Sequence, residues 1–332
     1  MTSHGPSRYA LAIGLTAALL AGCGGSQPPI GVPGAMLQSR VIATRAAHGK
    51  SWMLPEAKGQ DLIYATGGCE GTCILSYPQG KLVGEISGYQ GSGLSGDCSD
   101  GAGNVYISNN TEVVEFAHGG TTPIASFALP QGDANGCAID PKSGNLAVVF
   151  DFTGIAVFSK GSSAPTVYST LLDAQYCGYD NAGNLFVDGV TETRGIAYGL
   201  SELASGSSTF EMLTLDQKVG LPGQLQWDGQ YLTYESASPS LFTISRLDIS
   251  GSSATIVSQT KVKRVRNRLA QSWIYNGSII APYSNHGPRA WNIGIWQYPK
   301  GGDPTRRIIK FGEYDKKMFG FTGVTVSVAP SD

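Results

Sequence analysis

A phrase that returns about every forty residues constrains this chain more than any other feature. Each copy joins a cysteine, a turn containing aspartate, glycine and asparagine, and a short apolar strand. The three clearest copies are Cys98-Ser-Asp100-Gly-Ala-Gly103-Asn104-Val, Cys137-Ala-Ile-Asp140-Pro-Lys-Ser-Gly144-Asn145-Leu and Cys177-Gly-Tyr-Asp180-Asn-Ala-Gly183-Asn184-Leu. Short strands and glycine turns at this period predict a β-propeller, in which four-stranded sheets repeat around an axis.

A second phrase marks the end of a strand and places the remaining units. An aromatic residue or leucine is followed three positions later by a glycine, which turns the chain into the outermost strand. Copies stand at Tyr77–Gly80, Phe116–Gly119, Phe158–Gly161, Leu203–Gly206 and Tyr298–Gly301. With a diverged unit at 245–251, they predict an all-β, six-bladed β-propeller over residues 60–328. Seven blades are the alternative.

The two ends of this region complement each other. The first unit begins at Asp61 and lacks an inner strand of its own, whereas the C-terminal stretch 319–327 alternates like a strand without a partner. A last strand that completes the first blade closes the ring and removes an open sheet edge. We therefore expect 319–327 to pair with the first blade.

The residues before the repeats have a different composition. Arg8 and the apolar run Tyr9–Leu20 form an export signal that is too short to span a bilayer stably. The signal ends in Leu20-Ala-Gly-Cys23, which resembles the lipobox of bacterial lipoproteins. The resemblance implies that residues 1–22 are removed and that the Cys23 thiol carries lipid. The alternative is an ordinary signal peptide with an incidental cysteine.

A linker is expected between Cys23 and the propeller. The stretch after Cys23 is rich in glycine and proline and poor in charge, so it cannot bury a core. We assign residues 23–59 to the lipidated cysteine and a flexible linker. The expected location is the cell envelope, either the outer membrane or the outer face of the inner membrane, with membrane lipid as a partner through Cys23.

Charge is unevenly distributed along the chain. Residues 260–332 hold 12 Lys and Arg against 4 Asp and Glu, and the densest basic run is 261–268. In a ring, charge that is local in sequence is local in space, so one sector should be basic. It either contacts anionic lipid headgroups or an anionic glycan, or it is a solvated edge that discourages aggregation. We expect no nucleic-acid partner and a monomer.

The cysteines divide into three groups. Cys23 is assigned to lipid, and Cys69 and Cys73 are close enough in sequence to form a disulfide across a tight turn. The other three, Cys98, Cys137 and Cys177, occupy similar places in successive repeats. Equivalent positions on neighbouring blades are usually too far apart for a disulfide, so we interpret these three as small buried residues. The alternative is a thiolate metal site on the axis.

The pattern Gly-Cys-x-x-Asp-x-x-Gly-Asn-Leu, with the strand ends described above, resembles the NHL and YVTN classes of β-propeller repeat. The whole construction is similar to a group of bacterial propeller lipoproteins. The resemblance covers roughly residues 60–327. It implies the fold and leaves the activity open, because propellers host binding modules and enzymes alike.

A candidate ligand face lies opposite the Asp-x-x-Gly-Asn turns, where the loops between second and third strands and between blades gather. The candidate residues on this face are Asp97, Asn109, Asp133, Asp151, Tyr176, Asp188, Glu235, His286 and Arg289. Carboxylates, aromatic rings and a guanidinium group suit recognition of a protein or glycan. We predict a lipid-anchored binding or scaffold module.

The alternative function is a propeller hydrolase or lactonase that uses a cation at the channel mouth. Calcium is the cation that clustered carboxylates would hold, although a calcium site needs six or more converging oxygens. The Asp-x-x-Gly-Asn turns are separated by whole blades, and we interpret them as turns in which the side chains bond the backbone. We assign no catalytic residue, no metal ligand and no cofactor.

Overall fold

The protein is described here by a computed structural model. It describes residues 50–89, 96–191, 197–237, 242–265, 271–283, 292–308 and 320–330. Cys23, the part of the predicted linker up to residue 49, His286 and Arg289 lie outside the described residues.

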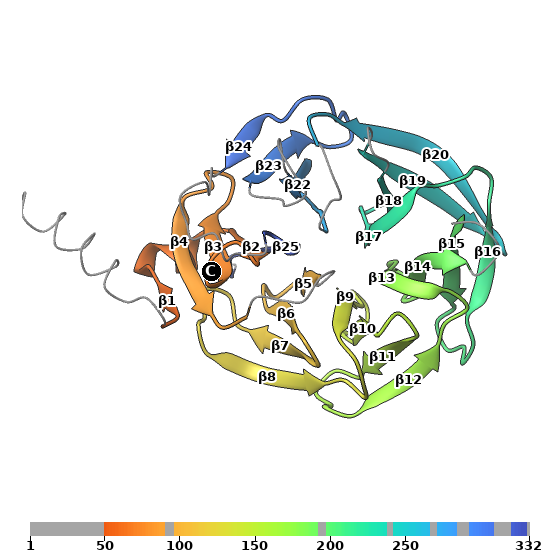
Figure 1. Cartoon of the computed structure of the whole chain (residues 1–332), viewed down its shortest axis with the longest axis horizontal. Helices are drawn as coiled ribbons and strands as arrows, with labels where there is room; N and C mark the ends of the chain where they lie inside the picture. The colour runs from red at the N-terminus through yellow and green to blue at the C-terminus, as the bar shows by residue number, and fades with distance from the viewer. Residues whose placement is uncertain are drawn as a thin grey trace, which may run out of the picture. The chain divides into compact units, whose positions relative to one another are not determined.

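Residues 50–330 build an all-β, propeller-like ring (Figure 1). The first sheet, in the order β1-β4-β3-β2-β25, contains β1 (Trp52–Met53), β2 (Leu62–Thr66), β3 (Gly71–Ser76), β4 (Leu82–Ser87) and β25 (Gly323–Ser327). The second contains β5 (Asp97–Ser99), β6 (Val105–Asn109), β7 (Glu112–Phe116) and β8 (Pro123–Ala128). The third contains β9 (Ala134–Ile139), β10 (Leu146–Phe150), β11 (Gly154–Phe158) and β12 (Pro165–Ser169).

An eight-stranded sheet follows, in the order β13-β14-β15-β16-β20-β19-β18-β17. One half contains β13 (Asp173–Tyr179), β14 (Leu185–Thr191), β15 (Ala197–Leu203) and β16 (Glu211–Leu215). The other contains β17 (Leu221–Trp227), β18 (Leu232–Ala237), β19 (Phe242–Ser250) and β20 (Ser253–Val262). The last sheet contains β21 (Trp273–Tyr275), β22 (Ser278–Tyr283), β23 (Asn292–Gln297) and β24 (Arg306–Ile308).

The hydrogen bonding thus divides the ring into five sheets rather than the six that the sequence predicts. The physical reason is one parallel contact between two outermost strands, in which Thr214 of β16 pairs with Ser253 of β20 and Leu215 with Ala254. This contact joins two antiparallel four-stranded units into one sheet.

The C-terminal strand completes the first sheet, which confirms the predicted pairing of the two chain ends. β25 runs antiparallel to β2, from Leu62 opposite Ser327 to Thr66 opposite Gly323. Val324 and Val326 pack in a core cluster with Ile280 and other side chains of the last sheet. β25 therefore links the first sheet to the last through side chains and to β2 through the backbone.

The ring begins earlier than residue 60, so the predicted boundary of the linker is wrong. Trp52 and Met53 form β1 on the outer edge of β4, opposite Glu85 and Gly84. The following 3-10 segment η1 (Pro55–Gly59) buries Ala57 in the core. These few apolar contacts hold residues 52–59 on the ring, although we assigned them to the linker. Among the residues that the structure describes, no helix has the length and apolar character needed to span a bilayer.

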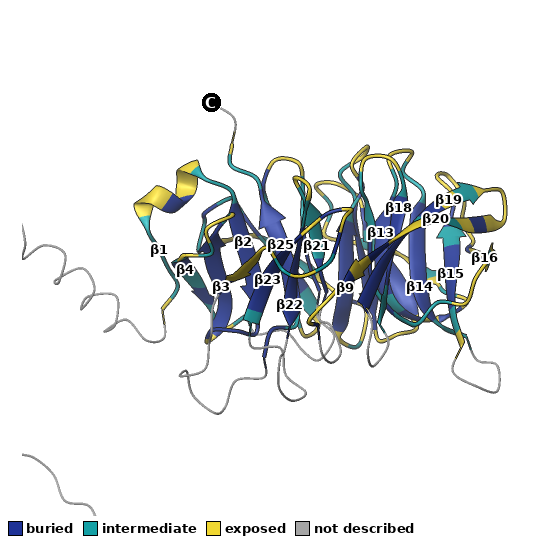
Figure 2. Ribbon diagram, turned by 90° about the horizontal axis from the view of Figure 1, so that it is seen from above, coloured by how far each residue is buried: buried dark blue, intermediate teal, exposed yellow. Residues whose placement is uncertain are grey.

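The apolar core lies between neighbouring sheets. Val149 of the third sheet, for example, packs in one cluster with Val187 of the next. In Figure 2 the strands of each sheet are mostly buried, and the exposed residues follow turns and outermost strands. Because each sheet is sandwiched between two others, its inner strands carry apolar side chains on both faces.

Candidate functional site

Polar side chains are buried where the innermost strands of the sheets approach one another. They are Asp97 on β5, Asn135 on β9, Tyr176 on β13, Asp188 on β14, Gln224 on β17, Glu235 on β18, and Gln271 and Ser272 before β21. All are at most 4% exposed. We call this set the axial polar cluster.

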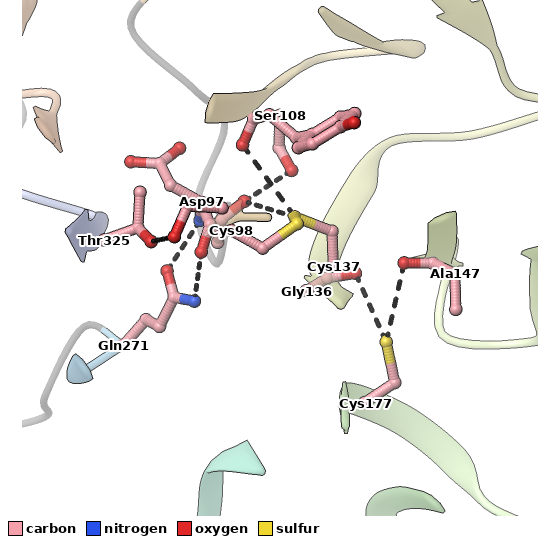
Figure 3. Close-up of a disulfide and its surroundings, with 12 residues drawn as sticks. Asp97, Cys98, Ser108, Gly136, Cys137, Ala147, Cys177, Gln271 and Thr325 are labelled. Atoms are coloured by element: carbon pink, nitrogen blue, oxygen red, sulfur yellow. Dashed lines mark hydrogen bonds between the residues drawn. A yellow bond between two sulfur atoms is a disulfide. The ribbon is translucent and has the colours of Figure 1, made fainter. Parts of the chain in front are cut away.

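Gln271 joins three strands at the centre of this cluster. Its Nε2 donates to the carbonyl oxygen of Asp97 and, at 2.9 Å, to Oε1 of Gln224. Its Oε1 accepts from the backbone N–H of Asp97 at 2.6 Å and of Val324 at 3.3 Å. One amide side chain therefore bonds backbone groups of both β5 and β25. Figure 3 shows its bonds to Asp97.

Glycines allow the inner strands to come this close. A Cβ on Gly136 would lie 2.8 Å from Cδ1 of Tyr176, and a Cβ on Gly96 would lie 3.2 Å from Cα of Gly136. A side chain at Gly136 would therefore push β9 away from β13.

Asp188 and Glu235 occupy the same place in two neighbouring units. Each is the fourth residue of its strand, and each faces an irregular register in the inner strand beside it. The N–H of Tyr176 donates to Oδ1 of Asp188 at 2.9 Å, and the N–H of Gln224 donates to Oε2 of Glu235 at 3.2 Å. A β-bulge leaves an amide without a ladder partner, and these carboxyl groups supply one.

Burial raises the pKa of all three carboxyl groups. Asp97 accepts a hydrogen bond from Oγ1 of Thr66 at 2.7 Å, but burial prevails and raises its pKa to about 7. The pKa of Glu235 is raised to about 8, although the Ser272 hydroxyl donates to it. Burial and the charge of Glu235 raise the pKa of Asp188 well above its ordinary value. Within the described residues, Oδ1 of Asp97 and Oδ2 of Asp188 have no hydrogen-bond partner, and an unbonded, buried oxygen disfavours the ionised carboxylate.

The axial polar cluster acts chiefly on the ring itself. Its carboxyl and amide groups bond the chain's own backbone and side chains and hold one inner strand against the next. Within the described ranges, no three His, Cys, Asp or Glu side chains are grouped so as to hold a metal ion. The calcium-dependent alternative stays a prediction, because calcium also accepts carbonyl and amide oxygens as ligands.

The structure separates the predicted ligand-face residues into two groups. Asp97, Tyr176, Asp188 and Glu235 are buried in the axial polar cluster, so they do not form an exposed face. The side chains that do reach the surface are Asp133 and Asp151, with Asn109 partly buried. His286 and Arg289 lie outside the described residues.

Cys98 and Cys137 form a disulfide, with their Cα atoms 5.7 Å apart, which corrects our prediction that neither is bonded (Figure 3). The reason is an offset of one residue. Cys98 pairs with Tyr106, the second residue of β6, whereas Cys137 pairs with Val148, the third of β10. Because successive strand residues point to opposite faces, Cys98 points toward the next sheet and Cys137 points back toward it.

Local geometry explains the states of the remaining described cysteines. Cys177 pairs with Val187, the third residue of β14, so it is the true equivalent of Cys137. It is buried, and its thiol lies 3.9 Å from the Gly136 carbonyl oxygen on the preceding sheet. Cys69 and Cys73 are joined by a disulfide with a Cα–Cα distance of 5.4 Å.

An exposed apolar pair, not singled out in the sequence, stands beside the predicted acidic residues. Phe152 is 41% exposed in the turn between β10 and β11, and Leu171 is 57% exposed in the segment between β12 and β13. The turn is held on both sides, because the N–H of Asp151 donates to the Asp133 carbonyl oxygen at 3.0 Å and the N–H of Ala174 donates to that of Phe152 at 2.8 Å.

The backbone of this turn is unusual for its residues. Asp151 has a φ of 49° and Phe152 a φ of 57°. Two successive residues of this kind form a hairpin turn that normally selects Asn-Gly, and a phenylalanine there costs of order 1 kcal/mol. The signal was present in the sequence, because an Asp-Phe pair replaces the expected small residues. We call Phe152, Leu171 and the exposed Asp133, Asp151 and Asp173 the turn patch.

Comparison with known proteins gives the fold alone. No protein-family model matches the chain, and no curated protein matches its sequence. A chain in the crystal structure of a nidogen/laminin complex matches with a TM-score of 0.61 and 14% identity, over 82% of this chain and 100% of that chain. A protein of unknown function from Bacteroides caccae matches with a TM-score of 0.58 and 13% identity, over 81% of this chain and 99% of that one. These likenesses establish a propeller-like all-β fold.

Proposed function

We propose that this protein is a lipid-anchored, extracytoplasmic β-propeller that binds a protein or glycan through its turn patch. In this proposal the eight-stranded sheet counts as two blades that share one outer contact, which gives six blades. The NHL- and YVTN-like repeats and the lipobox-like sequence before Cys23 support the assignment. The chain is then an envelope protein whose ring presents a ligand face.

The turn patch is the observation that carries the binding role. An exposed phenylalanine on a strained backbone, fixed by hydrogen bonds on two sides, is prepared for contact before any partner arrives. Aromatic anchors of this kind dominate the energetics of protein interfaces. Leu171 extends the apolar area, because its neighbour Thr170 bonds the carbonyl oxygen of Thr153 at 3.4 Å, and this favours a protein partner over a glycan.

The structural neighbours give a second line of support. One of them belongs to a complex between nidogen and laminin, so a fold of this shape occurs in a protein–protein assembly. The axial polar cluster supports a rigid scaffold as well, because its side chains are bonded within the ring.

A photoreactive phenylalanine analogue placed at residue 152 tests the binding role in intact cells. We expect a discrete adduct of higher mass after illumination, because the side chain faces its partner. The same analogue at Ile124, which is 56% exposed on β8, serves as the matched control. An equal adduct at both positions, or none at 152, would count against the turn patch.

The anchor is tested separately by Cys23→Ala. Without the thiol there is no site for lipid, so the variant should move from the membrane fraction to the soluble fraction. Immunoblots of fractionated cells measure this distribution. A variant that stays with the membrane refutes lipidation at Cys23 and leaves the turn patch unaffected.

A further inference from the structure

Two basic segments, almost forty residues apart in sequence, meet on the outer rim of the ring. β20 ends beside the turn between β23 and β24, and Val262 forms a parallel bridge with Gly302. The N–H of Lys263 donates to the Gly302 carbonyl oxygen at 2.8 Å, and the N–H of Gly302 donates to that of Lys261 at 2.8 Å. This backbone bridge places the cations of both segments on one surface.

Six cationic side chains in the described part of these two segments are exposed. They are Lys261, Lys263, Arg264, Lys300, Arg306 and Arg307, which we call the basic rim. Among the described residues of these two segments the one carboxylate is Asp303, whose Oδ1 lies 2.5 Å from Nε of Arg264. A hydrogen bond from Arg264, with the charges of Lys263 and Arg307 nearby, lowers the pKa of Asp303. Positive charge is therefore in large excess.

The basic rim is held in place by contacts with the ring. The indole N–H of Trp296, which is buried, donates to the Lys263 carbonyl oxygen at 3.1 Å. The Thr260 hydroxyl donates to the Pro299 carbonyl oxygen at 2.8 Å. The rim therefore presents its cations from a fixed backbone, and charges in a fixed array bind an anionic surface together.

We infer that the basic rim docks on an anionic phospholipid surface and sets the orientation of the ring at the membrane. The inference rests on the proposed lipid anchor, because a flexible linker of the length of residues 24–49 would have an average end-to-end distance of about 25–30 Å. At that distance weak contacts are enough to hold the domain on the bilayer surface. The cations stand on β20, on β24 and on the residues that follow β20 and precede β24.

The contributions of separate cations to binding of a negatively charged leaflet add up. Each Lys or Arg close to an anionic bilayer strengthens binding roughly fivefold at moderate ionic strength. Removal of three cations from the basic rim should therefore weaken binding on the order of 100-fold. The attraction should also disappear in high salt, because the Debye length shrinks to a few ångströms.

The experiment uses the chain from residue 24 onward, so that neither lipid on Cys23 nor the apolar run Tyr9–Leu20 contributes. Its cosedimentation is measured with vesicles of pure phosphatidylcholine and with vesicles of 70% phosphatidylcholine and 30% phosphatidylglycerol. We expect binding to the anionic vesicles only, and its loss in 0.5 M NaCl, about the ionic strength at which exposed charges are screened. Binding to both vesicle types alike overturns the inference.

Matched charge reversals locate the contact. One variant adds Lys261→Glu, Lys300→Glu and Arg306→Glu in the basic rim, and the control adds Lys81→Glu, Lys160→Glu and Lys218→Glu at other exposed positions. Both change the net charge equally. The rim variant should lose vesicle binding on the order of 100-fold, and the control less than about threefold.

Two outcomes of this comparison contradict the inference. Equal losses in both variants show that overall charge, not the rim, governs attraction. If the rim variant loses affinity for heparin while its vesicle binding is unchanged, the rim serves a soluble anionic glycan instead. Neither outcome bears on the anchor, which fractionation of Cys23→Ala tests by itself.

Discussion

Replacement of Cys98 and Cys137 by alanine should lower the free energy of unfolding by about 4 kcal/mol on the chain-entropy estimate. The disulfide joins residues 39 positions apart, so its loss frees a long loop in the unfolded chain. It also releases β5 from β9, the inner strands of two different sheets. For a chain of this size the midpoint of thermal unfolding should fall on the order of 10 °C.

The second disulfide provides the matched control. Cys69 and Cys73 are four positions apart, and the same estimate gives about 2 kcal/mol for their replacement. Urea unfolding of both double variants, followed by tryptophan fluorescence without reductant, measures the two values. If the Cys69/Cys73 variant is the less stable of the two, loop length does not govern the effect.

The contribution of the axial carboxyl groups to the free energy of unfolding should fall as the pH rises from about 4 to 8. Asp97 and Glu235 have pKa values near 7 and 8 in the folded state and ordinary lower values when unfolded. A raised carboxyl pKa means that the folded chain holds a proton that the unfolded chain releases. The stabilisation is complete below the unfolded pKa and is lost as the pH passes the folded one.

Asp97→Asn isolates one of these contributions. The amide oxygen still accepts the hydrogen bond from Thr66, but no proton is taken up. Each group contributes roughly 1.4 kcal/mol per pH unit between its two pKa values. Urea midpoints measured from pH 4 to 8 should fall less steeply in Asp97→Asn than in wild type. In the exposed control Asp151→Asn they should fall as steeply as in wild type. Parallel profiles for wild type and Asp97→Asn would show that the carboxyl group is ionised throughout.

The repeat was enough to predict the strands but not how the sheets join. Alternating apolar residues and glycine turns set each four-stranded unit, and the closing strand β25 follows from the unit that lacks an inner strand. The parallel pairing of Thr214 with Ser253 has no sequence pattern, because it joins the outermost strands of two different units. Such contacts depend on geometry across units, which a periodic phrase does not encode.

The disulfide was predictable from spacing that was visible in the phrases. Cys98 stands two residues before Asp100, whereas Cys137 stands three residues before Asp140. Because the turns are equivalent, this difference of one residue places the two side chains on opposite faces of their strands. Similar motifs must therefore be aligned on the turn rather than on the cysteine.

The buried carboxyl groups were harder to predict. Asp188 and Glu235 stand near loops, where polar residues are usually solvated. Their burial depends on bulges in β13 and β17 that leave amides to be satisfied. A bulge position cannot be located from one strand alone, so these residues appeared as ligand-face candidates.

The short strand β1 gives the ring a point of mechanical release. It is held on β4 by two residue pairs, the bond from the Leu54 N–H to the Val83 carbonyl oxygen and the bond from the Ser87 N–H to Ser51. Force entering through residue 50 loads these few bonds and then the buried Ala57 of η1, while β25 stays paired with β2 along five residues. Detachment of residues 50–60 would extend the chain by about 35 Å before force acts on the closed ring.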